Sequence, residues 1–367
     1  MKLGFFMMPA HPPDRLPYDY QQYDLQSLRW ADELDFSEAW IGEHYTVAWE
    51  PNPAPDLTIA QALLQTTKIK LAPGAHLLPY HHPVELAHRV AFLDHLAQGR
   101  LMLGIGAGGH EGDWMAFGVD GKNNEHRRMM VEALDIMLGI WKSEGEFKYD
   151  GQWWKVHIPP SMVNGQYRHH LFPYQKPHPP IGVAALTPRS STLKFAGERG
   201  FMPLSINLNL DYTAGHWETY SEAAEGAGHK ADRAEWRVYN EVLVADTDAE
   251  AERLFKNGAL GQVASDYLLE LYGEFGFLQH FKLDKSLPDS AINADYVMRN
   301  TWFVGSVNTV VDKLVDAQKR VGGFGTLLMS PTDWGNQPEI LHHSMELMAK
   351  EVLPRVEAKL APVAATA

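Results

Sequence analysis

The strongest constraint on the fold is an alternation of strand-like and helix-like segments that runs through the whole sequence. Short apolar runs alternate with segments in which apolar residues recur every three to four positions, as on one face of a helix. Met130, Leu134, Met137 and Trp141 form one such helical stripe. The predicted strands are 2–8, 38–44, 69–79, 101–108, 180–186, 201–207, 237–245 and 325–330. This alternation has no break in composition, so it predicts an α/β fold: a (β/α)8 TIM barrel in which residues 1–367 form one domain.

Two segments are longer than the repeat requires. Residues 144–178 are rich in Pro, Tyr and His, and residues 258–300 mix aromatic with acidic side chains. We expect these segments to be insertions after strands four and seven, the first of them crossing over the top of the barrel. Long additions of this kind are typical of lids and binding loops.

Charge and composition exclude several classes of protein. The chain has 32 basic and 46 acidic side chains, and this net charge of −14 disfavours nucleic acid or a membrane surface as a partner. It has no cysteine, so disulfides, thiolate catalysis and cysteine metal sites are excluded. Residues 1–15 are too short for a signal peptide, and no run approaches about 18 apolar residues, so we expect a soluble cytoplasmic protein.

The glycine run from Gly104 to Gly109 matches GxGxxG, the dinucleotide-binding pattern. That pattern normally opens the first βαβ unit and runs directly into a helix, whereas here three βα units precede it. In a barrel the same glycines lie at the C-terminal end of strand four, on the face where active sites form. Small residues there let a flat ring approach the strand ends, although they would also suit a crowded barrel interior.

Histidines lie at the ends of strands two, three and four, on the same predicted face of the barrel. His44 ends strand two, His76 ends strand three, and His110 follows strand four. A single histidine is often structural, but several on one face favour an active site, and His44 is the best candidate to exchange a proton. A barrel hydrolase with two metals generally needs an HxH pair on strand one, which "KLGFFMMP" lacks, so the sequence predicts no metal.

A possible phosphate site follows strand five. Thr187, Ser190 and Ser191 supply hydroxyl groups and Arg189 a cation at the start of the next helix. An ordinary N-cap is the alternative interpretation of the serines. Large apolar residues near the predicted strand ends and insertions could exclude water and accept an apolar substrate, although each alone could equally be core. They are Phe5, Phe6, Met7, Met8, Trp40, Trp114, Trp153, Trp154 and Met329.

Several ordered motifs together resemble the bacterial luciferase-like flavin monooxygenases. They are "AWIGEHY", "PGAHLLPYHHP", "LDHLAQGRLMLGIGAGG", "SSTLKFAGERG" and "FVGSVNTVVDKL". Within that family the chain is most similar to the limonene-type and diketocamphane-type enzymes. The resemblance implies a barrel that uses reduced FMN from a separate flavin reductase, and a flavin peroxide formed with O2. One oxygen atom would pass to a small apolar ketone, aldehyde or terpene-like substrate. Family members commonly dimerise through the helices that match 55–67 and 83–97, so a homodimer is implied.

The resemblance also implies roles for individual residues. His44 matches the family's histidine beside the flavin, and Ser190 and Ser191 match its phosphate-binding turn. Gly74 and Ala75 fall where the family has a non-prolyl cis peptide under the flavin ring. The substrate pocket is expected to include Phe6, Tyr45, His76, His110 and Trp114.

One departure from luciferase concerns the end of strand four. Luciferase has a reactive cysteine followed by a cofactor-binding arginine there, whereas this chain has Gly106 and Ala107. Arg189 is the candidate replacement for the missing cation, and Gly106 leaves room for oxygen at the flavin face. Tyr45 stands in place of a second histidine, which argues against light emission.

Two alternatives to a monooxygenase remain at this point. One is a deazaflavin-dependent oxidoreductase that transfers hydride on the same barrel, and the other is a non-catalytic flavin-binding relative. The substrate also stays open, because a ketone would give a lactone or ester and an alkene an epoxide.

Overall fold

A ring of parallel strands forms the centre of the molecule. The computed structural model describes residues 1–367 except 9, 168–170 and 362–367. Hydrogen bonds connect the strands in the order β3-β2-β1-β13-β10-β9-β8-β5-β4. Their bounds are β1 (Lys2–Met7), β2 (Glu38–Ile41), β3 (Lys70–Pro73), β4 (His76–Leu77), β5 (Leu103–Gly106), β8 (Ile181–Ala185), β9 (Met202–Ile206), β10 (Arg237–Asn240) and β13 (Thr326–Met329).

The ring closes within the third predicted strand. β3 and β4 are its two halves, separated by Gly74 and Ala75, and a bridge from Leu71 to Leu101 also joins this strand to the fourth. The α/β barrel predicted from the sequence is therefore confirmed, and the dinucleotide-binding interpretation of the glycine run is wrong. The run ends β5, a barrel strand preceded by three others.

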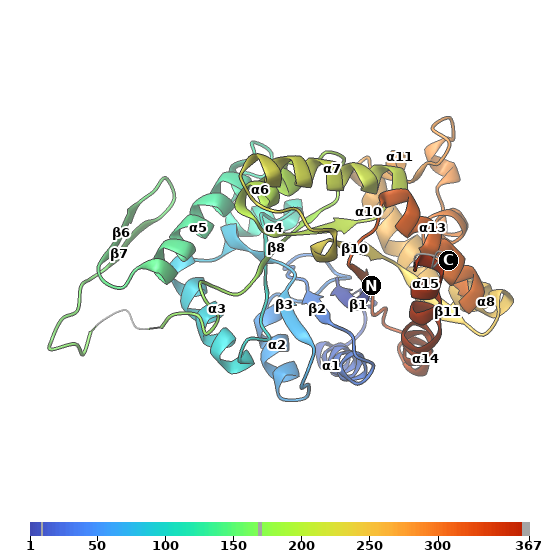
Figure 1. The fold of residues 1–367 in the computed structure, drawn as a ribbon, viewed down its shortest axis with the longest axis horizontal. Coiled ribbons are helices and arrows are strands. Elements are labelled where there is room, and N and C mark those ends of the chain that lie inside the picture. Colours follow the sequence, from blue (N-terminus) through green and yellow to red (C-terminus); the bar gives the residue numbers. More distant parts are fainter. Residues whose placement is uncertain (9, 168–170, 362–367) are drawn as a thin grey trace, which may run out of the picture.

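Helices surround the barrel, with α1, α2 and α3 on one side of the strands and α6 and α7 on the opposite side (Figure 1). Proline occupies the first turn of α1, α2 and α3, where its missing N–H is not needed. The main helices are α1 (Pro17–Glu33), α2 (Pro55–Leu63), α3 (Pro83–Ala97), α4 (Glu111–Phe117), α5 (Glu125–Lys142), α6 (Ser191–Arg199), α7 (Leu210–Gly226), α8 (Asp248–Asn257), α13 (Val307–Val321), α14 (Glu339–Leu347) and α15 (Leu353–Leu360). None of the helices in the described part of the chain is both long and apolar enough to cross a membrane.

The barrel interior is a packed core of its own. Side chains that alternate along the strands point inward and fill it, among them Phe6, Trp40, Ala72, Met102, Leu204, Tyr239 and Leu328. Phe5, Met7 and Met329 belong instead to the core between strands and helices. These residues are therefore barrel core, which was the alternative to a place in the wall of a substrate pocket.

The first insertion does not cross the top of the barrel. It forms an antiparallel hairpin of β6 (Phe147–Asp150) and β7 (Lys155–Ile158), which projects beyond α5, away from the strands (Figure 1). The cause is Glu132 on α5, whose carboxylate accepts backbone hydrogen bonds from Gln152, Trp153 and Trp154 at 2.9 Å each. These bonds hold the hairpin turn against α5.

The seventh predicted strand, 237–245, is in fact two strands. β10 belongs to the barrel, whereas β11 (Val242–Ala245) pairs in parallel with β12 (Phe303–Ser306) outside it. The split occurs at Glu241, whose carbonyl accepts a hydrogen bond of 2.9 Å from the Phe303 N–H. The insertion before β12 consists of α9 (Ala259–Val263), a π-helical turn (Ala264–Leu268), α10 (Leu269–Glu274), α11 (Leu278–Phe281) and α12 (Ala294–Asn300).

Candidate active site

A cavity of about 570 Å³ opens at the C-terminal ends of the barrel strands. Met8, Leu186 and Ile206 line it where three strands end. His44 and His110 line it from the loops after strands two and four, and Trp114 lines it from α4. The second insertion covers it with Leu268, Leu271, Tyr272, Phe275 and Phe277. The second insertion therefore lines the cavity, in agreement with the expectation of a lid or binding loop, and most of the lining is apolar.

A larger hollow of about 870 Å³ lies elsewhere, between the end of α5 and the segment around Pro177. None of the predicted site residues lines it. The cavity at the strand ends, where polar and apolar groups meet, is therefore the candidate active site.

His44 stands between two carboxylates at the edge of the cavity. Its Nε2 lies 3.0 Å from Glu50 Oε2, and its Nδ1 lies 3.5 Å from Asp113 Oδ2. Burial alone would lower the pKa of His44, but the charges and hydrogen bonds of these acids raise it to about 9. His44 is therefore an imidazolium at neutral pH, and it can hold or donate a proton.

Further hydrogen bonds fix both carboxylates. Tyr267 from the lid donates to Glu50 Oε1 at 2.6 Å. The Thr46 N–H and hydroxyl donate to Asp113 Oδ1 at 2.8 and 2.6 Å. His44 thus has a defined orientation, because its partners on both sides are held in place.

His110 has the opposite protonation preference. Its ring meets that of His44 edge to face, with the centroids 4.7 Å apart. Burial, followed by the positive charge on His44, lowers the pKa of His110. The site therefore combines one charged and one neutral imidazole.

Small residues lie together between β3 and β4 and at the end of β5, and we call this group the shelf. Gly74, Ala75, Gly106 and Ala107 are all half-buried, and none has a side chain larger than a methyl group. The peptide bond between Gly74 and Ala75 is cis, as the family resemblance implies. A Cβ on Gly106 would lie 3.1 Å from Leu77 Cδ2 and 3.4 Å from Ala75 Cβ, so the two parts of the shelf are in close contact.

The predicted phosphate turn contains both an N-cap and an open hydroxyl. Ser190 is buried and caps α6, because its Oγ accepts a hydrogen bond of 3.3 Å from the Thr192 N–H. Ser191 is exposed, and its Oγ accepts a hydrogen bond of 2.9 Å from Arg127 Nη1. Thr187 and Arg189 precede this turn, and Arg189 is exposed with φ of 47°.

Arg127 is a cation that the sequence analysis missed. It comes from α5, lines the cavity, and reaches the first residue of α6. Arg127 and Ser191 together, more directly than Arg189, fit a phosphate at the cavity edge. The pair of arginines in "EHRRMM" is the only trace of this role in the sequence, and it does not reveal that α5 packs beside α6.

Two more polar atoms at the cavity have no protein partner. The Trp114 Nε1 and His126 Nδ1 atoms are buried and make no hydrogen bond within the described part of the chain. Both residues line the cavity, and their rings are 5.0 Å apart. Such atoms fit a ligand with several hydroxyl or carbonyl groups, because an unsatisfied buried polar atom is costly.

Three of the residues predicted for the substrate pocket lie outside this cavity. Phe6 is in the barrel interior, where its ring contacts Tyr239 at 5.4 Å. The Tyr45 hydroxyl donates to Glu43 Oε1 at 3.0 Å, and His76 Nδ1 lies 2.7 Å from Glu43 Oε2. Glu43 therefore binds both of these side chains outside the cavity, whereas His110 and Trp114 do line it.

Glu43, His76 and His81 form a group that could hold a metal ion, with ligand atoms within 4.8 Å of one another. The sequence analysis predicted no metal. In the structure the three side chains contact one another directly, since His81 Nε2 lies 2.7 Å from Glu43 Oε1. Burial favours a raised pKa for Glu43, but the two histidines lower it to about 2. The three side chains are thus hydrogen-bonded to one another through Glu43, while the buried His76 Nε2 has no partner among the described residues.

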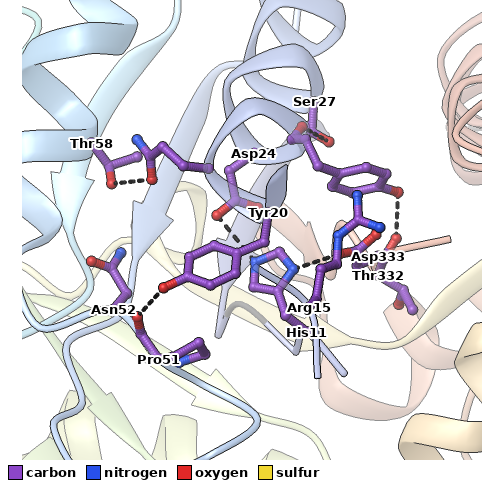
Figure 2. Close-up of polar contacts among 12 residues, drawn as sticks. His11, Arg15, Tyr20, Asp24, Ser27, Pro51, Asn52, Thr58, Thr332 and Asp333 are labelled. Carbon is purple, nitrogen blue, oxygen red and sulfur yellow. Dashed lines mark hydrogen bonds and ion pairs between the residues drawn. The ribbon is translucent and has the colours of Figure 1, made fainter. Parts of the chain in front are cut away.

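A buried polar hub supports the loop that carries Glu50 (Figure 2). His11 Nδ1 lies 2.7 Å from Asp333 Oδ2 and its Nε2 lies 3.3 Å from Asp24 Oδ2. Tyr20, whose ring stacks on that of His11, donates a hydrogen bond of 2.8 Å to the Pro51 carbonyl. The hub therefore joins the loops that follow strands one, two and eight.

Comparison with known proteins agrees with this geometry. Residues 1–322 match the family model for luciferase-like monooxygenases. The chain is 35% identical to 3,6-diketocamphane 1,6-monooxygenase of Pseudomonas putida, over 97% of this chain and 98% of that protein. It is 30% identical to limonene 1,2-monooxygenase of Rhodococcus erythropolis, over 98% of this chain and 87% of that protein.

Solved structures give the same relationship. The oxygenating constituent of 3,6-diketocamphane monooxygenase from Pseudomonas putida, a type II Baeyer-Villiger enzyme in complex with FMN, superposes with a TM-score of 0.92. It is 35% identical and covers 97% of this chain and 98% of its own. The F420-dependent tetrahydromethanopterin reductase of Methanopyrus kandleri has a TM-score of 0.68 at 20% identity, which shows a shared fold alone. The chain belongs to the luciferase-like monooxygenase family and is a flavin-dependent monooxygenase.

Proposed function

We propose that this chain is the oxygenase component of a two-component system that takes reduced FMN from a separate flavin reductase. With O2, it would insert one oxygen atom into a small apolar ketone, aldehyde or terpene-like substrate. One observation carries the proposal: a charged His44 lies in the same cavity as an apolar lid and an Arg127–Ser191 pair. The FMN-bound diketocamphane relative supports FMN as the flavin.

The residues in and near the cavity fit FMN. The shelf of Gly74, Ala75, Gly106 and Ala107, which lies outside the cavity lining but leads into the lining residues Gly108 and Gly109, would support the ring system. Arg127, which lines the cavity, would hold the phosphate together with Ser191. When bound, reduced FMN would supply the electrons that activate O2 for the transfer of one oxygen atom to a substrate.

The chain's own residues supply proton control and a dry site. His44 holds a proton between Glu50 and Asp113, so acid–base chemistry at the reacting centre depends on its charge. Tyr272, Phe275 and Phe277 close the cavity from the lid side, and closure of this kind limits the entry of water.

Anaerobic titration with reduced FMN, followed by admission of isotopically labelled O2 and a panel of cyclic ketones and terpenes, tests the proposal. We expect saturable FMN binding and one labelled oxygen atom in the product. Tight binding of a reduced deazaflavin, with hydride transfer and no oxygen uptake, would favour the alternative oxidoreductase. Flavin binding without oxygen uptake on any substrate would instead favour a non-catalytic relative.

We also propose that the chain forms a homodimer through α2 and α3. Leu57 on α2 and Leu64 at its end are 64% and 89% exposed, and Phe92 and Leu96 on α3 are 57% and 51% exposed. These helices pack against each other, and we call their four exposed apolar side chains the apolar patch. A second copy of the chain would cover that patch, as the family resemblance implies.

A further inference from the structure

Glu241 is a buried acid at the barrel mouth that the proposed function does not use. It directly follows β10 and is 4% exposed. The Tyr239 hydroxyl donates a hydrogen bond to Glu241 Oε1, so both side chains lie on the same side of the strand. Tyr239 is a barrel-interior residue, which places the Glu241 carboxyl inside the barrel, above it.

The register of the strands locates this carboxyl relative to the cavity. Tyr239 pairs with Ile206 on one side and with Leu328 on the other. Ile206 lines the cavity, as does Met8, which follows the inward-facing Phe6 by two positions. Glu241 therefore lies in the layer of strand ends next to the lining residues Ile206 and Met8, although it is not itself among the residues that line the cavity.

Glu241 has an unused hydrogen-bonding atom. Its Oε2 is buried and has no partner among the described residues. The lid residue Tyr272, which lines the cavity, lies close enough that burial and then the Glu241 charge raise its pKa. A buried acid with one unpaired oxygen, next to residues that line a cavity, is costly unless a ligand reaches it.

We propose that Glu241 selects carbonyl compounds, by donating a hydrogen bond from its protonated carboxyl group to the carbonyl oxygen of a substrate in the cavity. The inference rests on the proposed function, because it assigns the substrate class of the same cavity. It favours a ketone or aldehyde over an alkene, since the donor would otherwise remain unpaired. The same hydrogen bond would also polarise the carbonyl group of the substrate.

The protonation state supports this role. Burial raises the pKa of Glu241 to about 7, and the hydrogen bond from Tyr239 opposes this rise only partly. The groups around it are Tyr239 on its own strand and Tyr272 on the lid, with Glu50 and His44 beyond Tyr272. Below neutral pH the carboxyl is therefore a donor, and above it an anion that repels a carbonyl oxygen.

The test measures binding to the FMN-loaded protein, through calorimetry and the absorbance of oxidised FMN. The probes are norcamphor and norbornane, which differ by the carbonyl group. We expect Glu241→Met to weaken norcamphor binding about fivefold and to leave norbornane binding unchanged. Glu241→Gln keeps a neutral donor and should retain most of the norcamphor affinity.

A pH series provides the second arm. Norcamphor affinity of the unmodified protein should fall between about pH 6 and about pH 8.5, whereas that of Glu241→Gln should stay flat. His44 is present in both proteins, so its titration affects both equally. The difference between their two pH profiles of norcamphor affinity therefore reports on Glu241 alone. Thermal melts of both variants establish that they fold.

Three results would overturn the inference. They are equal binding of norcamphor and norbornane by the unmodified protein, unchanged norcamphor binding in Glu241→Met, and an effect of Glu241→Met on FMN affinity alone. The last would assign the hydrogen bond to a flavin carbonyl. Because binding is measured without turnover, absent oxygenation would count against the proposed function and leave this test valid.

Discussion

Arg127 Nη1 donates a hydrogen bond of 2.9 Å to Ser191 Oγ, which joins α5 to the first residue of α6 at the cavity edge. A guanidinium beside a helix N-terminus is a favourable site for phosphate. The chain lacks the arginine that luciferase has at the end of strand four, and Arg127 offers a cation from a different element.

Arg127→Ala should therefore weaken FMN binding by about tenfold or more, because it removes a charged partner of the phosphate. Riboflavin, which has no phosphate, should bind the variant and the unmodified protein equally. Fluorescence titration with both flavins measures this. Arg128→Ala is the matched control, since Arg128 is the next residue and lies near Trp153 instead. A larger loss in Arg189→Ala than in Arg127→Ala would contradict the assignment.

Product formation should decline as pH rises through about 9, because His44 loses the proton that Glu50 and Asp113 stabilise. His44→Gln should lower the rate by about a hundredfold or more at neutral pH. Glu50→Gln removes one of the charges that raise the pKa of His44, so the alkaline decline should move to lower pH. Rates measured with chemically reduced FMN across the pH range test both expectations.

Glu146→Gln on the exposed hairpin is the control for loss of a carboxylate. It should leave the alkaline decline in place, since Glu146 pairs with Lys148 and His157 instead. An unshifted decline in a folded Glu50→Gln protein would show that His44 is not the titrating group.

The hub around His11 should make stability depend on pH. The folded-state pKa of His11 is about 9, because Asp24 and Asp333 outweigh the lowering effect of burial, whereas the reference value is 6.5. The stabilisation is fully present below about pH 6.5 and is lost as pH rises through about 9. Asp24→Asn should lower the free energy of unfolding at pH 6.5 and flatten its decline toward pH 9.

Denaturant unfolding at several pH values measures this effect. Tyr20→Phe is the matched control, because it removes the neutral hydrogen bond to the Pro51 carbonyl and leaves the charges in place. It should cost about 1 kcal/mol at every pH. A parallel pH dependence in the Asp24→Asn and unmodified proteins would show that the His11 charge does not stabilise the fold.

The proposed dimer predicts that charges on α3 separate the subunits. Phe92→Lys combined with Leu96→Lys should convert a dimer to a monomer in sedimentation experiments, because both side chains are more than half exposed on the apolar patch. Met115→Lys is the control, since Met115 on α4 is 76% exposed and lies outside that patch. Dimers that survive the double substitution would exclude α3 as the interface.

Much of the barrel could be predicted because its signals are local. Alternating and helical patterns of apolar residues follow directly from which side of each element faces the core. The division of the seventh predicted strand into β10 and β11 at Glu241 could not be predicted from such local patterns. β11 pairs with β12, which follows about sixty residues later in the chain. The path of the hairpin likewise depends on Glu132, which lies on a different element.

The sequence by itself determined the α/β class, the face of the barrel that carries the site, and the candidate proton donor His44. These follow from periodicity and from the position of each residue in its own strand. Only the tertiary structure decided the charge on His44, the cation beside Ser191 and the buried acid next to the cavity lining. Each of those depends on Glu50, Arg127 or Glu241 reaching across from another strand or helix, and distances between separate elements are set by packing of the whole chain.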